Sequence, residues 1–343
     1  MNLLAVDGGN WKTHVALVRD DGQVLALARG AASSPHLVGE DGCVAVIESL
    51  IDDVRRDAGL PAGDGSLAEV AEVMLAGADL PAEEQRLQDV VAARGWARRA
   101  HVANDTFAVL RAGTERGWGV AVVCGAGINC VGVAPDGRSV RFPALGRITG
   151  DWGGGYDVGL EALYVAARGE DGRGPRTSLE QAVPRHFGLE LPSTLAREIH
   201  AGRIAQRRMI EVAPVVFAEA AHDGVAAAIV ERLAEEIVAL ARAALARLGL
   251  ERTAVEVVLG GGLLRSGDPR LLAAVEDGLA AVGSAVTVHP ATAPPVVGAA
   301  LHGLDRLGSN DAAKERLRRE LTAAVDGGRE PRSAGAALEA GRG

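Results

Sequence analysis

One pattern of elements occurs twice in this sequence, and it limits the possible folds more than any other feature. Residues 3–28 read as strand, Gly-rich turn, strand, Asp-Gly hairpin and strand, and residues 119–142 repeat that order about 118 residues further on. Asp-Gly between two apolar runs is a strong signal for a β-hairpin. A supersecondary pattern that recurs along one chain indicates domains of like topology. We therefore expect two α/β domains with a cleft between them.

Apolar residues recur at helical or strand spacing after each of these strand sets. After the first set we expect strands over residues 69–75 and 101–103, and helices over residues 41–58, over 81–93 and through Arg111. After the second set we expect helices over residues 156–168, 193–201, 205–221, 225–248, 269–282 and 296–307, with a last strand over residues 255–259.

The repeat and the composition together predict the domain boundaries. The first domain is expected over residues 1–115 and a larger second domain over residues 116–295. A C-terminal helix at about residues 296–322 is expected to pack on the first domain. Residues 326–343 are rich in Gly, Arg, Ala and Glu without periodicity, so we expect a disordered tail there.

Composition argues against several classes of partner. The formal net charge is −9, charges of both signs are scattered and no basic stripe occurs, so we expect no nucleic-acid partner. No apolar run approaches the ~18 residues of a membrane-spanning helix, so we expect no membrane partner. Cys43, Cys124 and Cys130 form no Cys-x-x-Cys pair. So few cysteines indicate a reducing compartment, and we expect a cytoplasmic protein.

The turn between the first two strands reads Asp7-Gly8-Gly9-Asn10-Trp11-Lys12-Thr13. Its glycines let backbone amides approach phosphate oxygens, while Lys12 and Thr13 can add a charge and a hydroxyl. Asp7, at the end of a buried strand, can hold Mg²⁺ directly or through water. The alternative is an ordinary Gly-rich hairpin. The motif is neither a P-loop nor a dinucleotide-binding fingerprint, because no helix follows the glycines.

Two further glycine motifs stand after strands of the second set. Gly125-Ala126-Gly127 occupies the turn that matches the first one, and two such hairpins facing each other can clamp a polyphosphate from both sides. Gly260-Gly261-Gly262, followed by Arg265, can lie against an adenine face or can be a plain strand-to-helix turn. The paired hairpins argue for nucleotide binding.

Two acidic motifs are candidates for sugar chemistry. Asn104-Asp105 stands where a short strand meets a helix, so Asp105 can be the general base that deprotonates a sugar hydroxyl. The competing interpretation is that this aspartate is a helix N-cap. Gly150-Asp151-Trp152 leads through three glycines into a helix, and Asp151 can bind sugar hydroxyls or the metal shell. The competing interpretation there is a flexible linker.

In their order and spacing, these motifs resemble the BadF/BadG-type ATPase family, in the branch of N-acetylglucosamine kinases and bacterial glucosamine kinases. That family belongs to the superfamily of sugar kinases, heat-shock chaperone ATPases and actin, and the resemblance covers about residues 1–307. It implies two ribonuclease-H-like (actin-like) domains, ATP and Mg²⁺ as cofactors, and a homodimer. The residues that it implies are Asp105 for catalysis, Asp7 for the metal, Gly9, Asn10, Trp11, Lys12, Thr13, Gly125, Ala126, Gly127, Gly261, Gly262 and Arg265 for the nucleotide, and Asn104, Asp105, Asn129, Gly146 and Asp151 for the sugar.

Some positions depart from the N-acetylglucosamine kinases. Their second hairpin usually reads Gly-Thr-Gly-Ser, whereas Ala126 and Ile128 lack those hydroxyls. Their sugar-binding asparagine falls near Pro35, and the Gly-Trp-Gly segment beside the acetyl group corresponds to residues 144–146, which read Ala-Leu-Gly. These differences favour a free amine, whose charge suits an acidic pocket. The sequence thus predicts phosphorylation of the 6-hydroxyl of an amino sugar, with glucosamine ahead of N-acetylglucosamine.

Two other functions stay open at this point. One is an ATPase activator of an acyl-CoA reductase or dehydratase, which bridges its dimer with an iron–sulfur cluster and needs two cysteines close in space. The other is a sugar sensor without catalysis. The joint presence of Asp7, Lys12, Asp105 and Asp151 favours an enzyme.

Overall fold

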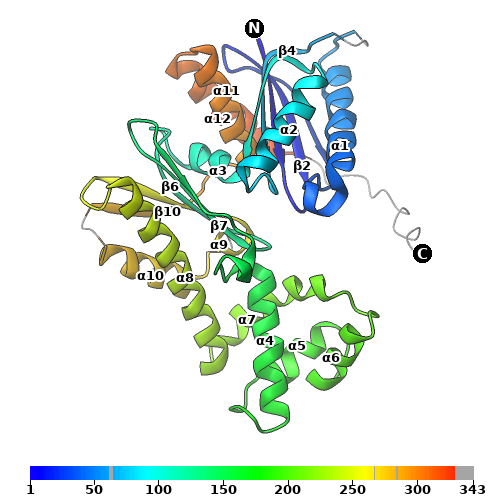
Figure 1. The fold of residues 1–343 in the computed structure, drawn as a ribbon, viewed down its shortest axis with the longest axis vertical. Coiled ribbons are helices and arrows are strands. Elements are labelled where there is room, and N and C mark those ends of the chain that lie inside the picture. Colours follow the sequence, from blue (N-terminus) through cyan, green and yellow to red (C-terminus); the bar gives the residue numbers. More distant parts are fainter. Residues whose placement is uncertain (62–64, 266, 283–284, 329–343) are drawn as a thin grey trace. The chain divides into compact units, whose positions relative to one another are not determined.

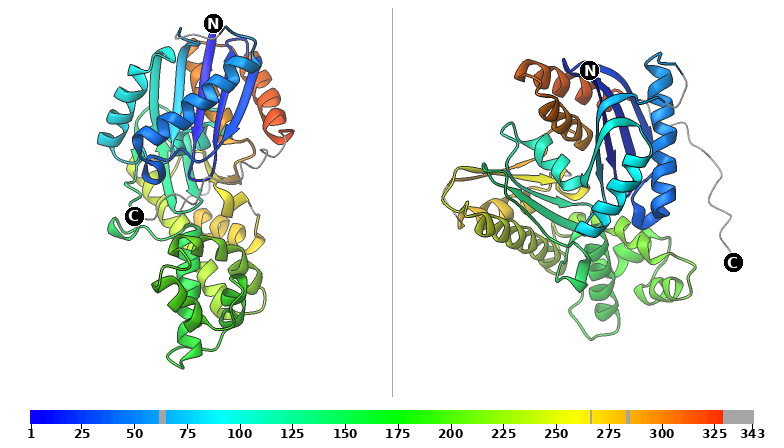
Figure 2. Two further views of the ribbon diagram at one scale, coloured as in Figure 1. Left: turned by 90° about the vertical axis from the view of Figure 1, so that its right-hand side faces the viewer. Right: turned by 45° about the horizontal axis from the view of Figure 1, so that its top comes forward.

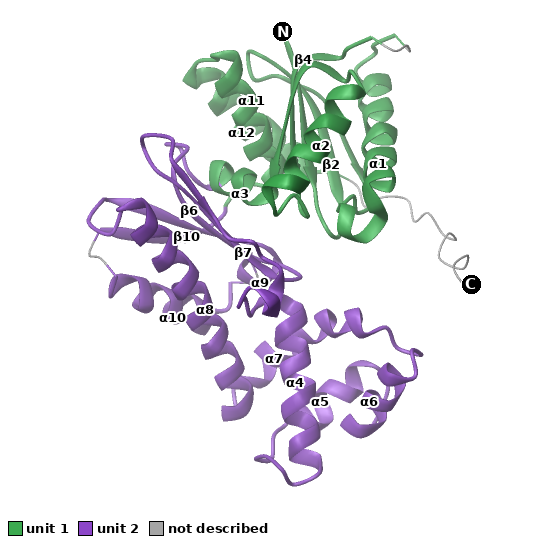
Figure 3. Cartoon of the chain, in the orientation of Figure 1, with its two compact units in different colours: residues 1–112, 292–343 green, residues 113–291 purple. Residues whose placement is uncertain are grey.

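The computed structural model describes residues 1–61, 65–265, 267–282 and 285–328. The chain forms two compact units, one from residues 1–112 together with the segment from 292 onward, the other from residues 113–291 (Figure 3). The second unit is thus inserted into the sequence of the first.

The first unit is built on a five-stranded sheet with the strand order β3-β2-β1-β4-β5. The strands are β1 (Asn2–Gly8), β2 (Thr13–Arg19), β3 (Val24–Gly30), β4 (Ala68–Leu75) and β5 (Ala97–Asn104). The first three are antiparallel neighbours, while β4 and β5 run parallel to β1. The meander predicted at the N-terminus is confirmed.

Helices cover both faces of this sheet (Figure 1, Figure 2). Side chains alternate along β1, so Leu4 and Val6 join one apolar cluster while Leu3 and Ala5 join another. The first cluster lies under α1 (Pro35–Asp57) and α2 (Pro81–Ala93), and the second lies under α3 (Asp105–Gly113), α11 (Pro295–Leu307) and α12 (Asp311–Asp326).

The second unit repeats this sheet. Its strand order is β10-β9-β6-β7-β8, which read from β8 is the order of the first sheet. The strands are β6 (Gly119–Cys124), β7 (Ile128–Val133), β8 (Ser139–Arg141), β9 (Val255–Gly260) and β10 (Val286–Pro290). The predicted repeat and the α/β fold class are confirmed. The prediction that residues 255–259 form the last strand is wrong, because β10 pairs parallel to β9.

Helices of the second unit share one large apolar core with its sheet. They are α4 (Gly154–Glu170), α5 (Leu179–His186), α6 (Pro192–His200), α7 (Ala213–Glu219), α8 (Gly224–Leu248), α9 (Gly262–Arg265) and α10 (Pro269–Ala280), with 3₁₀ turns η1 (Gly146–Ile148) and η2 (Gln206–Val212). The helix predicted over residues 205–221 is instead η2 followed by α7. Pro214 stands in the first turn of α7, where a residue without an N–H is tolerated but cannot continue a preceding helix.

The C-terminal segment also differs from prediction. The helix expected over residues 296–307 is α11, but its expected continuation to about residue 322 is interrupted, because Gly308 adopts a left-handed conformation with φ 70° and divides the segment into two helices. The second of them, α12, continues to Asp326, and residues 329–343 of the predicted tail lie outside the described residues. Within the described ranges, no helix combines the length and the apolar character that spanning a membrane requires.

Candidate active site

Three carboxylates lie at one edge of the first sheet. Parallel strands β1, β4 and β5 end together, since Gly8 pairs with Leu75 and Leu75 pairs with Asn104. The side chains that stand at or just beyond these strand ends include Asp7, Asp79 and Asp105. Carboxyl ends of parallel strands are the usual place for a ligand site in an open α/β sheet.

The pKa of Asp105 is raised to about 7. Burial is the largest cause, and the negative charges of Asp7 and Asp79 raise it further. Hydrogen bonding with the backbone amides of Thr106 and of Asp105 itself only partly offsets these effects. A carboxyl group with a pKa near neutrality is matched to proton transfer at physiological pH.

Asn104, and not Asp105, caps helix α3. Its Oδ1 accepts hydrogen bonds from the Thr106 amide at 3.0 Å and from the Thr106 hydroxyl at 2.6 Å, while its Nδ2 donates to Asp79 Oδ1 at 2.7 Å. Asn104 is only 2% exposed. Its amide is therefore engaged inside the unit, which supports a role in positioning the neighbouring Asp105 and leaves direct sugar contact as a prediction.

Asp79 was not among the residues predicted for the site, and it connects the strand-end carboxylates to a second cluster. His36 Nδ1 lies 3.9 Å from Asp79 Oδ2, and His36 Nε2 lies 3.4 Å from Glu83 Oε1. The other oxygen of Glu83 accepts from the amides of Asp79 and Leu80 and so caps α2. Asp7 and Asp105 stand at strand ends, whereas Asp79 lies beyond the end of β4 at Leu75, so the strand-end signal that found the other two does not mark it.

The first glycine turn is held at its base by hydrogen bonds. The Gly9 amide donates to the Lys12 carbonyl at 3.0 Å, and the Ser33 amide donates to the Gly9 carbonyl at 3.2 Å. The Thr13 hydroxyl lies 2.7 Å from both the Ala31 carbonyl and the Ser33 hydroxyl, and Thr13 is fully buried. Thr13 thus anchors the hairpin from inside the unit.

Other predicted residues of this turn differ in exposure. Asn10 is exposed, Lys12 is half-buried, and the Trp11 side chain is 68% exposed. An indole with so little packing inside its own unit is available to a ligand or another surface.

The second glycine turn connects β6 to β7 and is held by main-chain groups. The Gly125 amide donates to the Gly127 carbonyl at 2.9 Å. Two amides of the first turn of α4 donate to the same hairpin, from Gly155 to the Gly125 carbonyl at 2.8 Å and from Tyr156 to the Ala126 carbonyl at 3.0 Å. These bonds fix the backbone of the turn without any polar side chain.

Close backbone packing brings the three glycine-rich segments of this unit together. A Cβ on Gly154 would lie 2.4 Å from the Gly127 Cα, and a Cβ on Gly261 would lie 2.2 Å from the Cys124 carbonyl oxygen. Both positions have positive φ values, 79° and 90°. Only glycine fits either place. Gly262 and Arg265, which follow on α9, are exposed.

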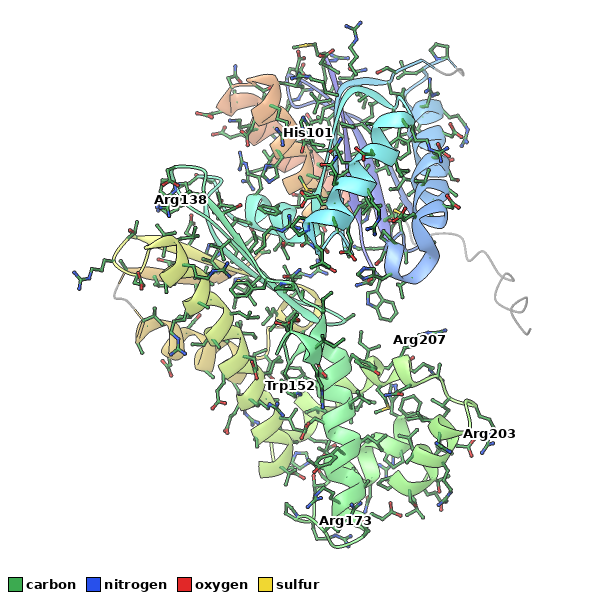
Figure 4. All side chains as sticks on the ribbon, in the orientation of Figure 1. His101, Arg138, Trp152, Arg173, Arg203 and Arg207 are labelled. Atoms are coloured by element: carbon green, nitrogen blue, oxygen red, sulfur yellow. The ribbon has the colours of Figure 1, made fainter. Side chains whose placement is uncertain are left out.

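The predicted sugar loop is a compact turn in the second unit. The Asp151 amide donates to the Gly146 carbonyl at 3.0 Å, and the Thr149 hydroxyl lies 2.5 Å from Asp151 Oδ2. Gly146 has a φ of 67°, which favours glycine. Trp152, labelled in Figure 4, is buried, and the Arg232 guanidinium lies 4.1 Å from its ring centroid.

The cysteines of this unit are poorly suited to hold an iron–sulfur cluster. Cys124 and Cys130 are both buried, and burial raises the pKa of the Cys124 thiol to about 12 and that of Cys130 as well. Thiolates are the metal-binding form, so such thiols are unreactive. The predicted sugar ligand Asn129, beside Cys130 on β7, is half-buried, and its Oδ1 accepts from the Cys130 amide at 2.7 Å.

The strand-end carboxylates fit a divalent cation of the Mg²⁺ type. Their oxygen atoms are the ligands that this ion prefers. Asp7 and Asp79 both raise the pKa of Asp105, and a nearby positive charge would relieve that repulsion. Asp7 is the residue of this group that we expect to hold the ion, directly or through water.

The chain is similar to known proteins over most of its length. The model of the BadF/BadG/BcrA/BcrD ATPase family matches residues 4–303. An N-acetylmuramic acid/N-acetylglucosamine kinase of Clostridium acetobutylicum is 27% identical over 267 residues, which cover 77% of this chain and 86% of that protein. An N-acetyl-D-glucosamine kinase of Dictyostelium discoideum is 27% identical over 274 residues, with the same coverage of 77% and 86%.

A solved structure shares the fold over most of its length. The protein, from Chromobacterium violaceum and provisionally named an N-acetylglucosamine kinase, superposes with a TM-score of 0.70 at 26% sequence identity. The match covers 88% of this chain and 98% of that one. The two-sheet architecture described above is therefore shared with this solved structure.

Proposed function

Because the chain belongs to the BadF/BadG/BcrA/BcrD ATPase family, we propose that it is an ATP-dependent kinase that phosphorylates the 6-hydroxyl of an amino sugar. The observation that carries the proposal is the position and the raised pKa of Asp105. This residue stands at the end of β5, beside Asp7 and Asp79, with a pKa raised to about 7. The names of the relatives from Clostridium acetobutylicum and Dictyostelium discoideum support an amino sugar as the acceptor.

In the proposed reaction, the carboxylate of Asp105 accepts the proton of the 6-hydroxyl while that oxygen attacks the γ-phosphorus. The bond from the γ-phosphorus to the bridging oxygen breaks, and ADP leaves with both electrons of that bond. Phosphoryl transfer has a loose transition state, so most of the rate comes from positioning and from stabilising charge. Asn104 serves this positioning by capping the helix on which Asp105 lies.

Backbone amides of the two glycine turns are the proposed phosphate ligands, with Lys12 as the accompanying cation. Ala126 brings no hydroxyl, so the second turn contributes through its main chain alone. Asp7 would hold Mg²⁺, which neutralises charge on the phosphates when it is bound. Gly261, Gly262 and Arg265 are the proposed adenosine contacts.

Glucosamine is the sugar that we place first, and N-acetylglucosamine is the alternative. Pro35 and residues 144–146 lack the groups that the resemblance associates with the acetylated sugar. The names of both relatives favour the alternative. Asn129, Gly146 and Asp151 are the proposed sugar contacts in the second unit. A homodimer, which the resemblance implies, is part of the proposal, and light scattering on the purified chain tests it.

A coupled assay of ADP release tests the function, with glucosamine, N-acetylglucosamine, glucose and N-acetylmuramate as acceptors. We expect ADP release to depend on an amino sugar, with the highest kcat/KM for glucosamine. A higher value for N-acetylglucosamine would replace the substrate but keep the reaction. ADP release without dependence on any sugar would contradict the proposal. A purified protein that is brown and contains iron would favour the activator function.

A further inference from the structure

His14 is a buried histidine that the proposed reaction does not use. It lies on β2 and pairs with Asp7 of the neighbouring antiparallel strand β1. Side chains of such a pair project from the same face of the sheet. His14 is 2% exposed and Asp7 is 8% exposed. The pair therefore lies in the protein interior, and one of its two members is the carboxylate proposed for the metal.

The ring nitrogen nearest to Asp7 lacks a hydrogen bond. His14 Nδ1 lies 3.7 Å from Asp7 Oδ2, and within the described part of the chain it has no hydrogen-bond partner. Leaving a buried polar group unpaired is unfavourable, because the group has given up its hydrogen bonds to water. Other buried polar side chains nearby, such as Thr13 and Asn104, have partners within hydrogen-bond distance. A small shift of the Asp7 carboxylate toward the ring would give His14 Nδ1 a hydrogen-bond acceptor.

A histidine is unusual at position 14, because its neighbours on the same face of the sheet are apolar. Along β2, alternation places His14 on the same face as Ala16 and Val18, which belong to the apolar cluster under α11. An apolar residue would continue that face without an unpaired group. A buried ring nitrogen without a hydrogen-bond partner therefore calls for an explanation from the site beside it.

We propose that His14 is a positioning residue for the metal-binding carboxylate, donating from Nδ1 to Oδ2 of Asp7 in the complex with Mg²⁺ and nucleotide. The inference rests on the proposed function, which assigns Asp7 to the metal. A hydrogen bond to one oxygen of a carboxylate fixes the direction of the other oxygen. Such supporting partners typically contribute about 10–100-fold to metal affinity.

Metal affinity of the full chain with ADP gives the test, using Mn²⁺ as the probe and electron paramagnetic resonance to count the free ion. His14→Leu removes the donor at nearly constant volume. His14→Asn places an amide N–H at the position of Nδ1 and is the matched control. We expect the Leu variant to bind Mn²⁺ about 10–100-fold more weakly and the Asn variant to stay within about threefold of the wild type.

A second measurement does not depend on the folding of the Leu variant. Selective ¹⁵N labelling of the eight histidines, with His14 assigned by its loss in the Asn variant, reports the tautomer in the complex with Mg²⁺ and ADP. We expect His14 to carry its proton on Nδ1. A proton on Nε2 alone would overturn the inference, since Nδ1 could not then donate.

The possible failures are distinguishable. Equal Mn²⁺ affinity of the Leu and Asn variants, in a chain whose wild type phosphorylates the sugar, overturns the role of His14 and leaves the proposed function intact. A wild-type chain that binds neither Mn²⁺ nor ADP overturns both. If the Leu variant does not fold, the tautomer of the wild type decides the question alone.

Discussion

The two glycine turns occupy equivalent places in the two sheets, yet they are held in different ways. In the first turn a side chain adds to the main-chain bonds, because the buried hydroxyl of Thr13 meets that of Ser33. Main-chain amides from α4 hold the second turn, and its packing leaves no room for a side chain at Gly154. The strand-end carboxylates also belong to the first unit. The copy in the first unit, which carries the side chains proposed to react, is called the reactive copy below, and the copy in the second unit, whose turn is fixed by main-chain bonds, is called the rigid copy.

The largest effect should come from the reactive copy. Asp105→Asn removes the proposed general base while keeping the shape of the side chain, so we expect kcat to fall about 10²–10⁴-fold with the KM for ATP nearly unchanged. Asp89→Asn, at an exposed position on α2, is the control and should keep full turnover. Steady-state kinetics with both substrates varied makes the comparison. Turnover close to the wild type in Asp105→Asn would remove this carboxylate from the mechanism.

The rigid copy should respond to added bulk. In Gly154→Ala the new Cβ would lie 2.4 Å from the Gly127 Cα, so the turn must move. We expect kcat/KM for ATP to fall about 10–100-fold. The free energy of unfolding should fall by about 1–3 kcal/mol more than the backbone strain of alanine at a positive φ alone would cause.

Gly137→Ala is the matched control for that strain. Gly137 also has a positive φ, 84°, but a Cβ there would meet no atom within 4 Å. Kinetics and urea unfolding of both variants separate the clash from the strain. Equal effects at the two positions would show that the packing of Gly154 against the hairpin is unimportant.

The pH profile sharpens the comparison on the side of the first unit. Asp105 must be ionised to accept a proton, and its pKa is raised to about 7. We expect kcat/KM for ATP to fall tenfold for each pH unit below about 7 and to level off above it. Asp79→Asn removes one of the charges that raise this pKa, so the acid limb should move to lower pH. A profile that stays flat down to pH 5 would contradict the assignment.

The same pKa has a consequence for stability. The ordinary value of 3.8 is raised to about 7 in the folded chain, so between these values the folded state keeps a proton that the unfolded state has lost. The free energy of unfolding therefore falls as the pH rises through that interval, by the contribution of this one carboxyl. Asp105→Asn should remove this contribution, which urea unfolding at several pH values measures.

The smallest functional effect should come from Thr13, despite its place in a phosphate turn. Thr13→Val leaves the Ser33 hydroxyl and the Ala31 carbonyl without this partner, so the free energy of unfolding should fall by about 1–3 kcal/mol. The KM for ATP should change less than twofold, and Thr13→Ser should behave as the wild type. A tenfold rise in that KM at unchanged stability would instead make the hydroxyl a phosphate ligand.

The repeated strand pattern was readable from the sequence because its signals are local. Glycine turns, Asp-Gly hairpins and alternating apolar residues predicted both meanders and their shared topology. Strand β10 was missed, although its counterpart β5 had been identified in the first copy. Residues 286–290 of β10 are only partly buried and end in Pro290, so they lack the apolar run that marks an internal strand. Helix α5 was missed because Pro184 within it indicates a break.

The candidate site was predictable only in part, because its geometry depends on contacts distant in sequence. The strand-end position of Asp105 was visible, but the residue that caps α3 was not, since either Asn104 or Asp105 suits an N-cap. Asp79 became significant only when the parallel pairing of β4 and β5 placed it beside Asn104. His14 could not be distinguished from any other strand residue until its pairing with Asp7 was known.

The insertion of one unit within the other has a consequence for biosynthesis. On the ribosome, residues 1–112 emerge long before α11, whose Val296 and Leu301 complete the cluster around Leu3 and Met74. Until then, α3 is the part of the first unit that covers this face of the sheet, and the places of α11 and α12 stay open. The inserted unit is continuous in sequence. All of its residues therefore leave the ribosome before α11, and it can finish folding before the first unit does. A nascent chain stopped before α11 should therefore bind holding chaperones through the apolar residues of the sheet that α11 would cover.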